Sequence, residues 1–398
     1  MHLIWGIFGI FVILSIAFIF SKNKKSIKLR TILGGLSFQI FFAFVVLKWE
    51  TGKQALEWVT FRVQNIIDYA NEGIEFLFGT LANTDEWGSI FAFHVLPIII
   101  FFSALISVLY YLGIMQILIK FIGGGLSKLL GTSKTESMSA AANIFVGQTE
   151  APLVVRPFLS KMTQSELFAV MTGGLASVAG SVLVGIYLLG VPLEYLLAAS
   201  FMAAPSGLIM AKMFMPETEE SETSDEIEIE KDTETTNVID AAAKGASDGM
   251  SLALNVGAML LAFIALIALI NGILGIFGGL TLETILGYIF APLAFAVGVP
   301  WAEAVTAGGF IGQKLVLNEF VAYASFAPEM ESLSDKTNLV VSFALCGFAN
   351  LSSMAILLGG LGGLAPDRRS DIAKMGLRAV AAGALASLLS AAVAGMFF

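Results

Sequence analysis

The chain is poor in the residues on which several classes of protein depend. It has one cysteine among 398 residues, Cys346, so no disulfide bond can form within it. Only two histidines accompany that cysteine, which excludes zinc sites built from histidine and cysteine. The sequence has no GxxxxGK(S/T) phosphate loop and no HExxH motif, which argues against an ATP-driven pump and a zinc protease.

Charged residues are also scarce, and long hydrophobic runs take their place. Charged residues make up 13% of the chain, against about 25% in an ordinary soluble domain. A membrane crossing takes roughly 20 mostly apolar residues. Stretches that lack Asp, Glu, Lys and Arg and reach this length are 1–20, 88–119, 167–193, 249–282, 337–366 and 379–398. The sequence therefore predicts an all-α polytopic membrane protein, in preference to a soluble protein with a very large helical core.

Most of the formal net charge of −9 belongs to one segment. Residues 217–240 contain eleven acidic residues and one lysine, and the rest of the chain is close to neutral. Runs of like charge are usually solvated and disordered. We expect residues 215–246 to form an acidic cytoplasmic linker, with an interaction tail as the alternative.

Basic residues predict how the chain crosses the membrane, because Lys and Arg gather in cytoplasmic loops. The cluster at 21–30 orients a first helix from outside to inside, and we expect that helix to be retained instead of cleaved as a signal peptide. The later clusters place both termini outside a bacterial plasma membrane. The transmembrane helices are expected at about 1–20, 31–48, 88–111, 164–190, 194–214, 247–272, 337–358 and 374–398. Segments 49–87 and 112–134 mix charged and apolar positions, which is typical of interfacial helices.

Two mostly apolar segments, 135–161 and 304–328, do not fit as simple crossings. Each is interrupted by polar residues, is too short for two crossings and is too broken for one. We expect two re-entrant hairpins, because irregular backbone survives at membrane depth only when it is buried in protein or lines a water-filled cavity. The glycine-rich stretch 359–363 is expected to be a flexible turn.

Each hairpin precedes a helix with a small and polar centre, "ASVAGS" (176–181) and "FANLSS" (348–353). Because the two hairpins enter from opposite faces, the pattern predicts an inverted repeat with a substrate site near the midplane. Asn350 and Ser353 are candidates for that site, although they could equally serve helix packing.

Glu150 and Glu319 are the strongest functional candidates. An ionisable side chain at the bilayer centre costs roughly 2.5–3.5 kcal/mol on insertion scales, so its presence there calls for a function. The alternatives are that Glu150 lies in water beside Arg156, and that Glu319 pairs with Lys314.

Three segments together resemble the signatures of a known family. "GQTEAPLVVRPFL" (147–159), "NEFVAY" (318–323) and "CGFANLSS" (346–353) are similar to signature segments of the concentrative nucleoside transporter family. Residues 237–271 also resemble that family's sixth helix, so the resemblance extends over nearly the whole chain. It implies eight transmembrane helices, two opposed hairpins, a homotrimer and elevator-like movement of a transport part against a scaffold part.

On this resemblance, the chain divides into six segments. The expected scaffold segments are 1–134 and 247–303, and the expected transport segments are 135–214 and 304–364. The linker at 215–246 and a last helix at 365–398 complete the chain.

The resemblance also implies a nucleoside site. Gln148, Thr149 and Glu150 would face the nucleobase, Glu319, Asn350 and Ser353 would hold the ribose hydroxyls, and Val182 and Phe348 would line the pocket. These residue types suit the ligand, because a carboxylate accepts hydroxyl protons and a glutamine offers both a donor and an acceptor to a base edge.

A sodium site is implied in the same way. Its ligands would be main-chain carbonyls of Asn143, Val146 and Val178 and the hydroxyl of Ser177. Hard oxygen ligands at a broken helix suit a small cation. Ser177 favours sodium as the coupling ion, and no other cofactor is expected. A proton is the alternative, in which case Glu150 or Glu319 would titrate.

We therefore expect a sodium-coupled importer of nucleosides such as uridine, embedded in lipid and without a nucleic-acid partner. A membrane-embedded enzyme with the two carboxylates as acid and base would need a nucleophile or a metal, and none stands out. No feature of the sequence favours a channel, because paired hairpins suit the alternating access of a transporter. The sequence leaves open purine against pyrimidine preference and the ion stoichiometry.

Overall fold

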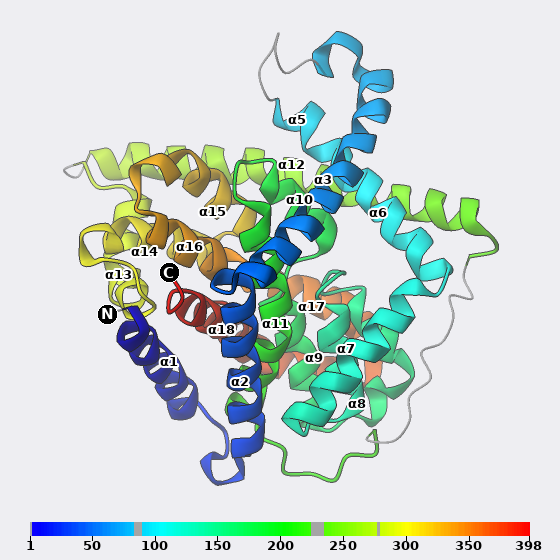
Figure 1. Cartoon of the computed structure of the whole chain (residues 1–398), viewed down its shortest axis with the longest axis vertical. Helices are drawn as coiled ribbons and strands as arrows, with labels where there is room; N and C mark the ends of the chain where they lie inside the picture. Colours follow the sequence, from blue (N-terminus) through cyan, green and yellow to red (C-terminus); the bar gives the residue numbers. More distant parts are fainter. Residues whose placement is uncertain (1, 83–89, 224–234, 277–278) are drawn as a thin grey trace.

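The computed structural model describes residues 2–82, 90–223, 235–276 and 279–398, and every regular element in these ranges is a helix (Figure 1). The α-helices are α1 (His2–Ile19), α2 (Leu29–Leu47), α3 (Glu50–Phe78), α5 (Phe91–His94), α6 (Leu96–Tyr111), α7 (Ile114–Leu130), α8 (Lys134–Ala142), α9 (Gln164–Ala176), α10 (Gly180–Tyr187), α11 (Leu193–Phe214), α12 (Val238–Gly275), α13 (Leu282–Ala296), α14 (Trp301–Val316), α15 (Glu319–Phe326), α16 (Asp335–Leu345), α17 (Leu351–Leu364) and α18 (Arg369–Ala394). Short 3₁₀ helices are η1 (Lys24–Ser26), η2 (Gly79–Ala82), η3 (Ala151–Lys161), η4 (Ala327–Ser332) and η5 (Pro366–Arg368).

Seven helical segments of the described chain are long and apolar enough to cross a membrane. They are α1, α2, α5 with α6, α9 with α10, α11, α12, and η5 with α18. The helices α13 and α14 pass the same test only as a pair, bent by 116°. The expected helix at 337–358 is not among these spans, and its residues form α16 and α17, of which α17 is a shorter apolar helix.

Helices α9 and α16 both end inside the protein at polar or small residues. After α9, Ser177 has φ −115° and ψ 171°, and Ala179 is also extended before α10 begins. After α16, the extended Asn350 begins α17 by accepting a hydrogen bond from the Ser353 N–H. An extended N-cap residue whose side chain accepts from the first turn is a strong start signal for a new helix. The two segments with small, polar centres are therefore broken helices, as the sequence indicated.

Some boundaries predicted from the sequence were wrong. The stretch 359–363 is not a turn but lies inside α17. Glycine is only about 1 kcal/mol less favourable than alanine in a helix. Packing can therefore outweigh the low helix propensity of the four glycines among these five residues. Helix α12 extends over 38 residues, so residues 238–246 are helical and do not belong to a linker.

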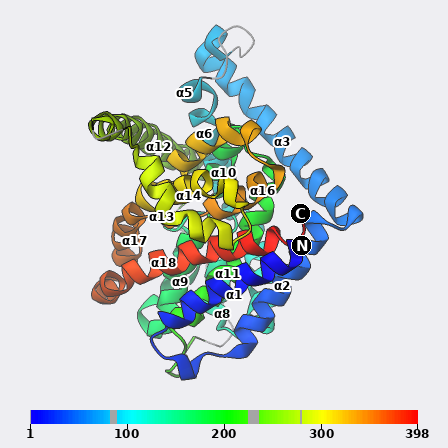
Figure 2. The same ribbon diagram turned by 90° about the vertical axis from the view of Figure 1, so that its left-hand side faces the viewer.

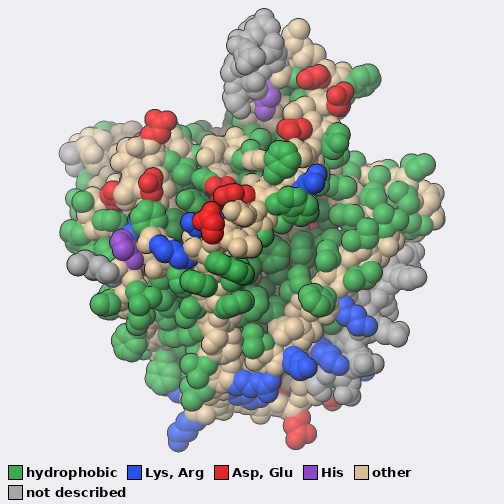
Figure 3. All heavy atoms as spheres, viewed as in Figure 1, with side chains coloured by type: hydrophobic (Ala, Val, Ile, Leu, Met, Phe, Trp, Pro, Cys, Tyr) green, Lys and Arg blue, Asp and Glu red, His purple; other side chains and the backbone are tan. Residues whose placement is uncertain are grey.

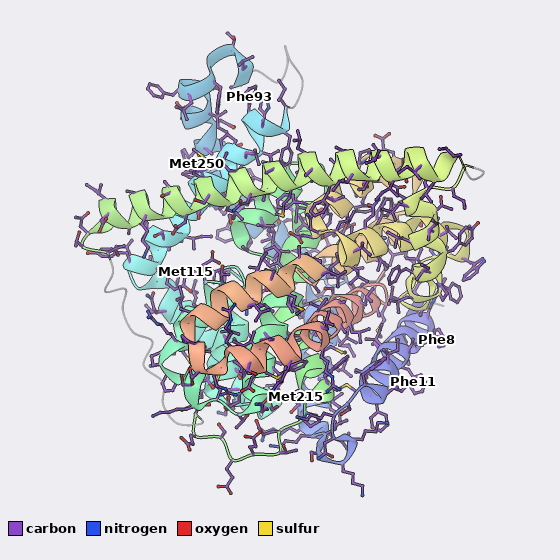
Figure 4. All side chains as sticks on the ribbon, turned by 180° about the vertical axis from the view of Figure 1, so that it is seen from behind. Phe8, Phe11, Phe93, Met115, Met215 and Met250 are labelled. Atoms are coloured by element: carbon purple, nitrogen blue, oxygen red, sulfur yellow. The ribbon has the colours of Figure 1, made fainter. Side chains whose placement is uncertain are left out.

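The protein has a more buried inner body that is flanked by peripheral helices (Figures 1 and 2). The inner body is α8–α11, α16 and α18, in which the apolar windows of α9–α10, α11 and α18 are 83–94% buried. The peripheral helices are α1, α2, α3, α6 and α12, and the apolar windows of α1, α2, α6 and α12 are only 17–28% buried. In Figure 4, Phe8, Phe11 and Met250 lie on two of these outer helices, and all three are largely exposed. Exposed large apolar side chains over this extent suit contact with lipid.

The first residues of the predicted linker are packed against the inner body. Thr223 is buried, and its hydroxyl donates to Glu166 Oε1 over 2.7 Å. Ser221 donates to the same carboxylate oxygen over 2.5 Å. The expected disorder is therefore wrong for this end of the segment, whose own hydroxyl groups bind α9. Residues 224–234 lie outside the described residues.

Glycines allow α13 and α14 to pack backbone to backbone. A Cβ on Gly308 of α14 would lie 2.6 Å from the Gly287 carbonyl oxygen and 2.7 Å from the Ala291 nitrogen of α13. Small residues let helices in membranes approach this closely. The first arm of the second hairpin is thereby held against its neighbour.

We predict that Gly308→Val destabilises the protein by about 1–3 kcal/mol or more, because backbone atoms cannot move aside for the added methyl groups. The measurement is the thermal unfolding midpoint in detergent, followed by tryptophan fluorescence. Gly272→Ala in α12 is the control, since its added Cβ meets nothing within 4 Å. Equal midpoints for both variants and the parent would contradict the packing argument.

Candidate functional site

The two broken helices touch at their breaks. The Phe348 N–H, between α16 and α17, donates to the Ser177 carbonyl oxygen, between α9 and α10, over 3.0 Å. Gly347 comes so close that a Cβ there would lie 2.9 Å from the Ala176 carbonyl oxygen. Each break thus satisfies part of the other's unpaired backbone, which is required of buried irregular segments.

The tip of the first hairpin lies against the α9–α10 break. Between α8 and η3, the Phe145 carbonyl oxygen accepts the Gly180 N–H over 2.9 Å. A Cβ on Gly174 of α9 would lie 2.9 Å from Gln148 Cβ. Pro152 stands at the start of η3, and this second arm is a 3₁₀ helix with Pro157 inside it. A proline within an arm removes a hydrogen-bond donor and prevents a regular α-helix.

The tip of the second hairpin is the start of α15. Asn318 is its extended N-cap, and its Oδ1 accepts the Val321 N–H over 2.9 Å. Glu319 is the first residue of that helix. The carboxylate consequently lies at a helix N-terminus, where the helix dipole favours negative charge.

Four of the expected site residues meet at the start of α17. Asn350 Nδ2 donates to Glu319 Oε2 over 3.2 Å, and Asn350 Oδ1 accepts the Ser353 N–H over 2.8 Å. Gln148 Nε2 donates to Ser353 Oγ over 3.4 Å. All four residues are at most 6% exposed. The two hairpin tips and one broken helix therefore form a single buried polar cluster, which we call the tip cluster.

Thr149 and Val182, two other expected site residues, lie on segments that contact the elements of the tip cluster. Thr149 packs on α17, where a Cβ on Gly360 would lie 2.8 Å from its Cγ2. Val182 is buried on α10. One turn later on the same helix, the Cβ position of Gly185 is 3.2 Å from Cζ of Phe320, the residue that follows Glu319.

Glu150 is not a member of the tip cluster. The residue is exposed, and its carboxylate folds back so that Oε2 lies 2.5 Å from the Cβ position of Gly147. Within the described part of the chain, neither Glu150 with Arg156 nor Glu319 with Lys314 forms an ion pair within 4.0 Å. The pairings considered as alternatives are therefore absent there.

The tip cluster offers free hydrogen-bonding groups to a ligand. Among the described residues, Gln148 Oε1 and Asn318 Nδ2 are buried and have no hydrogen-bond partner. Buried polar atoms are normally paired, so each exception calls for an explanation such as a ligand or water. Together with the Glu319 carboxylate, they can bind a molecule that carries hydroxyl groups and a heterocycle with donors and acceptors.

The four expected ion ligands lie where the first tip meets the α9–α10 break. Asn143, Val146, Ser177 and Val178 are at most 4% exposed. Asn143 Nδ2 donates to the Ser139 carbonyl oxygen over 2.9 Å, while Asn143 Oδ1 has no partner among the described residues. A buried oxygen without a donor is what a cation site needs.

The sequence reasoning missed three residues near the site. Asn318 begins α15, and the Asn-Glu pair in front of an apolar run was an available N-cap signal. Gly347 has no side chain where the backbone of Ala176 passes, and this close approach cannot be seen in the sequence. Ser387 of α18 accepts a hydrogen bond from Lys314 over 2.9 Å, and nothing in the sequence near Ser387 indicates this partner.

Family models match most of the chain. The model described as "Na+ dependent nucleoside transporter C-terminus" matches residues 195–395, and the corresponding N-terminus model matches residues 8–81. A model described as "Nucleoside recognition" matches residues 92–193.

Two bacterial relatives match over nearly their whole length. The "Uncharacterized transporter YutK" of Bacillus subtilis is 61% identical, with 100% of both chains covered. The "Nucleoside permease NupC" of Helicobacter pylori is 48% identical, over 99% of this chain and 97% of the permease. The solved structure of CNTnw in an inward-facing substrate-bound state is 54% identical with a TM-score of 0.96, over 100% of this chain and 99% of that one. Variants of CNTnw in outward-facing and intermediate states are similar, with TM-scores of 0.94–0.96.

We predict that Asn350→Ala costs more stability than the loss of a helix cap. Asn237 caps α12 in the same way, by accepting the Asp240 N–H over 3.0 Å, but it is exposed. Asn237→Ala should therefore cost about 1 kcal/mol. Asn350→Ala also leaves the buried Glu319 carboxylate without its amide donor, which adds about 1–3 kcal/mol. Thermal unfolding in detergent compares the two, and an equal loss would rule out a stabilising Asn350–Glu319 bond.

Proposed function

Because the chain belongs to the concentrative nucleoside transporter family, a family of transporters and not of enzymes, we propose that it is a sodium symporter that imports nucleosides across the plasma membrane. The observation that carries the substrate assignment is the tip cluster. It brings a carboxylate, two amides and a hydroxyl from three separate segments to one buried point. Gln148 Oε1 has no partner within it among the described residues, and a partly satisfied buried network costs free energy unless a ligand completes it.

In the proposed binding mode, the ribose lies at the start of α17. Glu319, Asn350 and Ser353 bind its hydroxyl groups, with the carboxylate as the principal acceptor. Gln148 reads the nucleobase with its free Oε1 and its amide protons, and Thr149 borders the base from the same tip. Val182 and Phe348 supply apolar contact. Glu150 reaches the base only after its carboxylate leaves Gly147, so it is a secondary contact in this proposal.

The proposed sodium ion lies between the first tip and the α9–α10 break. Main-chain carbonyls of Asn143, Val146 and Val178 and the Ser177 hydroxyl would supply hard oxygen ligands. The unpaired Asn143 Oδ1 supports a cation there and adds a fifth oxygen to the set. The description of the family as Na+ dependent supports sodium over protons. When bound, the ion would neutralise the carbonyl end of α9 and hold the first tip against the break.

For transport, we propose that the inner body moves against the peripheral helices and carries with it the two hairpins and α17, which hold the substrate groups. The inward-facing, intermediate and outward-facing states of the similar CNTnw support movement of this kind. We place both termini outside, since exposed Lys and Arg gather at the end of the molecule that holds the α1–α2 loop and residues 217–223 (Figure 3). The exposed apolar faces of the peripheral helices are available for lipid and for two further copies in a homotrimer.

Uptake of labelled uridine and adenosine into proteoliposomes tests the assignment. We expect uptake of a nucleoside that requires an inward sodium gradient. Uptake driven by a proton gradient alone would replace the sodium assignment with proton coupling. No uptake of either nucleoside by folded protein would refute the substrate proposal.

Glu319→Gln is predicted to lower nucleoside uptake at least tenfold, because the neutral amide replaces the charged acceptor for two hydroxyl groups and a charge-assisted bond of this kind contributes about 1.5–3 kcal/mol. The matched control is Glu331→Gln in η4, just after the same hairpin, where the side chain is exposed. Near-normal uptake by a folded Glu319→Gln protein would contradict its role toward the ribose.

Ser177→Ala is predicted to raise the sodium concentration needed for half-maximal uptake, because one ligand of the ion is lost. Ser206→Ala in α11 is the matched control. Both hydroxyls are buried and donate to the carbonyl four residues earlier, over 3.1 Å from Ser177 and 2.9 Å from Ser206. A structural effect alone would appear in both variants, so an unchanged sodium response of Ser177→Ala would count against the site.

A further inference from the structure

Lys314 is a buried cation that the nucleoside site does not explain. It lies in the last turn of α14 and is 1% exposed. Its Nζ donates to the Ala344 carbonyl oxygen in the last turn of α16 over 2.9 Å, and to Ser387 Oγ of α18 over 2.9 Å. Among the described residues, no carboxylate oxygen lies within 4.0 Å of Nζ.

The surroundings of this ammonium group resemble those of an alkali-metal ion. Both of its acceptors are uncharged oxygen atoms, one from the backbone and one from a hydroxyl. The last carbonyls of a helix have no partner within the helix and carry partial negative charge, so a cation stabilises them. A buried charge without a counter-ion is costly unless such groups compensate it. Lys314 therefore serves the carbonyl end of α16.

The same place in the first repeat is the proposed sodium site. In each repeat a hairpin precedes a helix that breaks, α9 at Ser177 and α16 at Cys346. Ser177 and Val178 of the proposed sodium site lie at the carbonyl end of α9, with Asn143 at the end of α8 beside them. The Lys314 ammonium lies at the carbonyl end of α16. The two ends are close neighbours, because a Cβ on Gly347 would be 2.8 Å from Ser387 Oγ and 3.1 Å from the Leu175 carbonyl oxygen.

We propose that Lys314 is a tethered cation, which takes in the second repeat the place that the mobile sodium ion takes in the first. It holds the first arm of the second hairpin to the broken helix and so positions Glu319, five residues further on. It also keeps a second ion out of that place, so that one sodium ion is bound per chain. The inference about stoichiometry rests on the proposed sodium symport, whereas the role of the ammonium group at α16 does not.

The experiment measures the thermal unfolding midpoint against sodium concentration in detergent, with choline replacing sodium at constant ionic strength. An ion that binds only the folded protein stabilises it by RT ln(1 + [Na⁺]/Kd), so each additional site steepens the dependence at high sodium. In Lys314→Ala, the space left by the side chain is open to an ion. We expect a low midpoint in choline that sodium raises with about twice the parent's slope.

Lys314→Met is the matched variant, because its side chain fills much of the same space without a charge. It should lose stability in choline and keep the parent's sodium slope. Lys336→Met is a second control, since Lys336 is also a buried lysine but lies 4.2 Å over the Trp5 ring at the other end of α16. If Lys314→Ala does not fold, Lys314→Ser takes its place, with a hydroxyl oxygen for the ion.

The outcomes separate this proposal from the sodium symport. A steeper slope in Lys314→Ala or Lys314→Ser alone supports the tethered cation, even if the parent shows no sodium response and the symport proposal fails. Equal slopes in the parent, Lys314→Ala and Lys314→Ser overturn it. If Lys314→Met also shows a steeper dependence of the midpoint on sodium, the proposal is overturned as well. The methionine fills the space of the lysine, so the added stabilisation could not come from an ion in that space.

Discussion

The backbone hydrogen bond from Phe348 to Ser177 is the contact on which the site depends. A helix that breaks inside an apolar protein leaves carbonyl and amide groups without partners, and each such group is costly. This protein breaks two helices at the same depth and lets them satisfy each other. Because the breaks meet, the two hairpin tips that pack on them are brought to one place.

The surroundings of the contact follow from the same need. Gly347 and Gly180 have no side chain where another backbone passes within about 3 Å. Asn350 and Asn318 each cap a new helix with the side-chain oxygen Oδ1. The amide nitrogen of Asn350 remains available and donates to Glu319. At the carbonyl ends of the broken helices, cations stabilise the unpaired carbonyl groups. In our proposal these cations are the sodium ion at α9 and Lys314 at α16.

The inner body and the peripheral helices differ in how many buried polar groups need hydrogen-bond partners. The inner body, together with the starts of α15 and α17, carries the buried polar groups, and most residues of α9, α11 and α16 are enclosed. The peripheral helices present large apolar residues outward, which requires no pairing of polar groups. That difference agrees with the proposed movement of one part against the other, in which the polar groups of the tip cluster would stay together.

The sequence by itself determined the membrane class, the approximate places of most helices, the two interrupted segments and the family. These features depend on local composition: long runs without charge, N-cap residues, and prolines and glycines beside polar groups. It also predicted the residues of the tip cluster, through the resemblance of three segments.

Only the tertiary structure decided which polar groups meet. Residues 359–363 became helical because packing of α17 outweighed glycine propensity, and Glu150 turned back over Gly147 while Glu319 paired with Asn350. Lys314 and Ser387 are 73 residues apart, and their contact depends on how α14, α16 and α18 cross. Local patterns indicate where a chain bends or carries a charge, but the partner of a buried group is set by segments far away in the sequence.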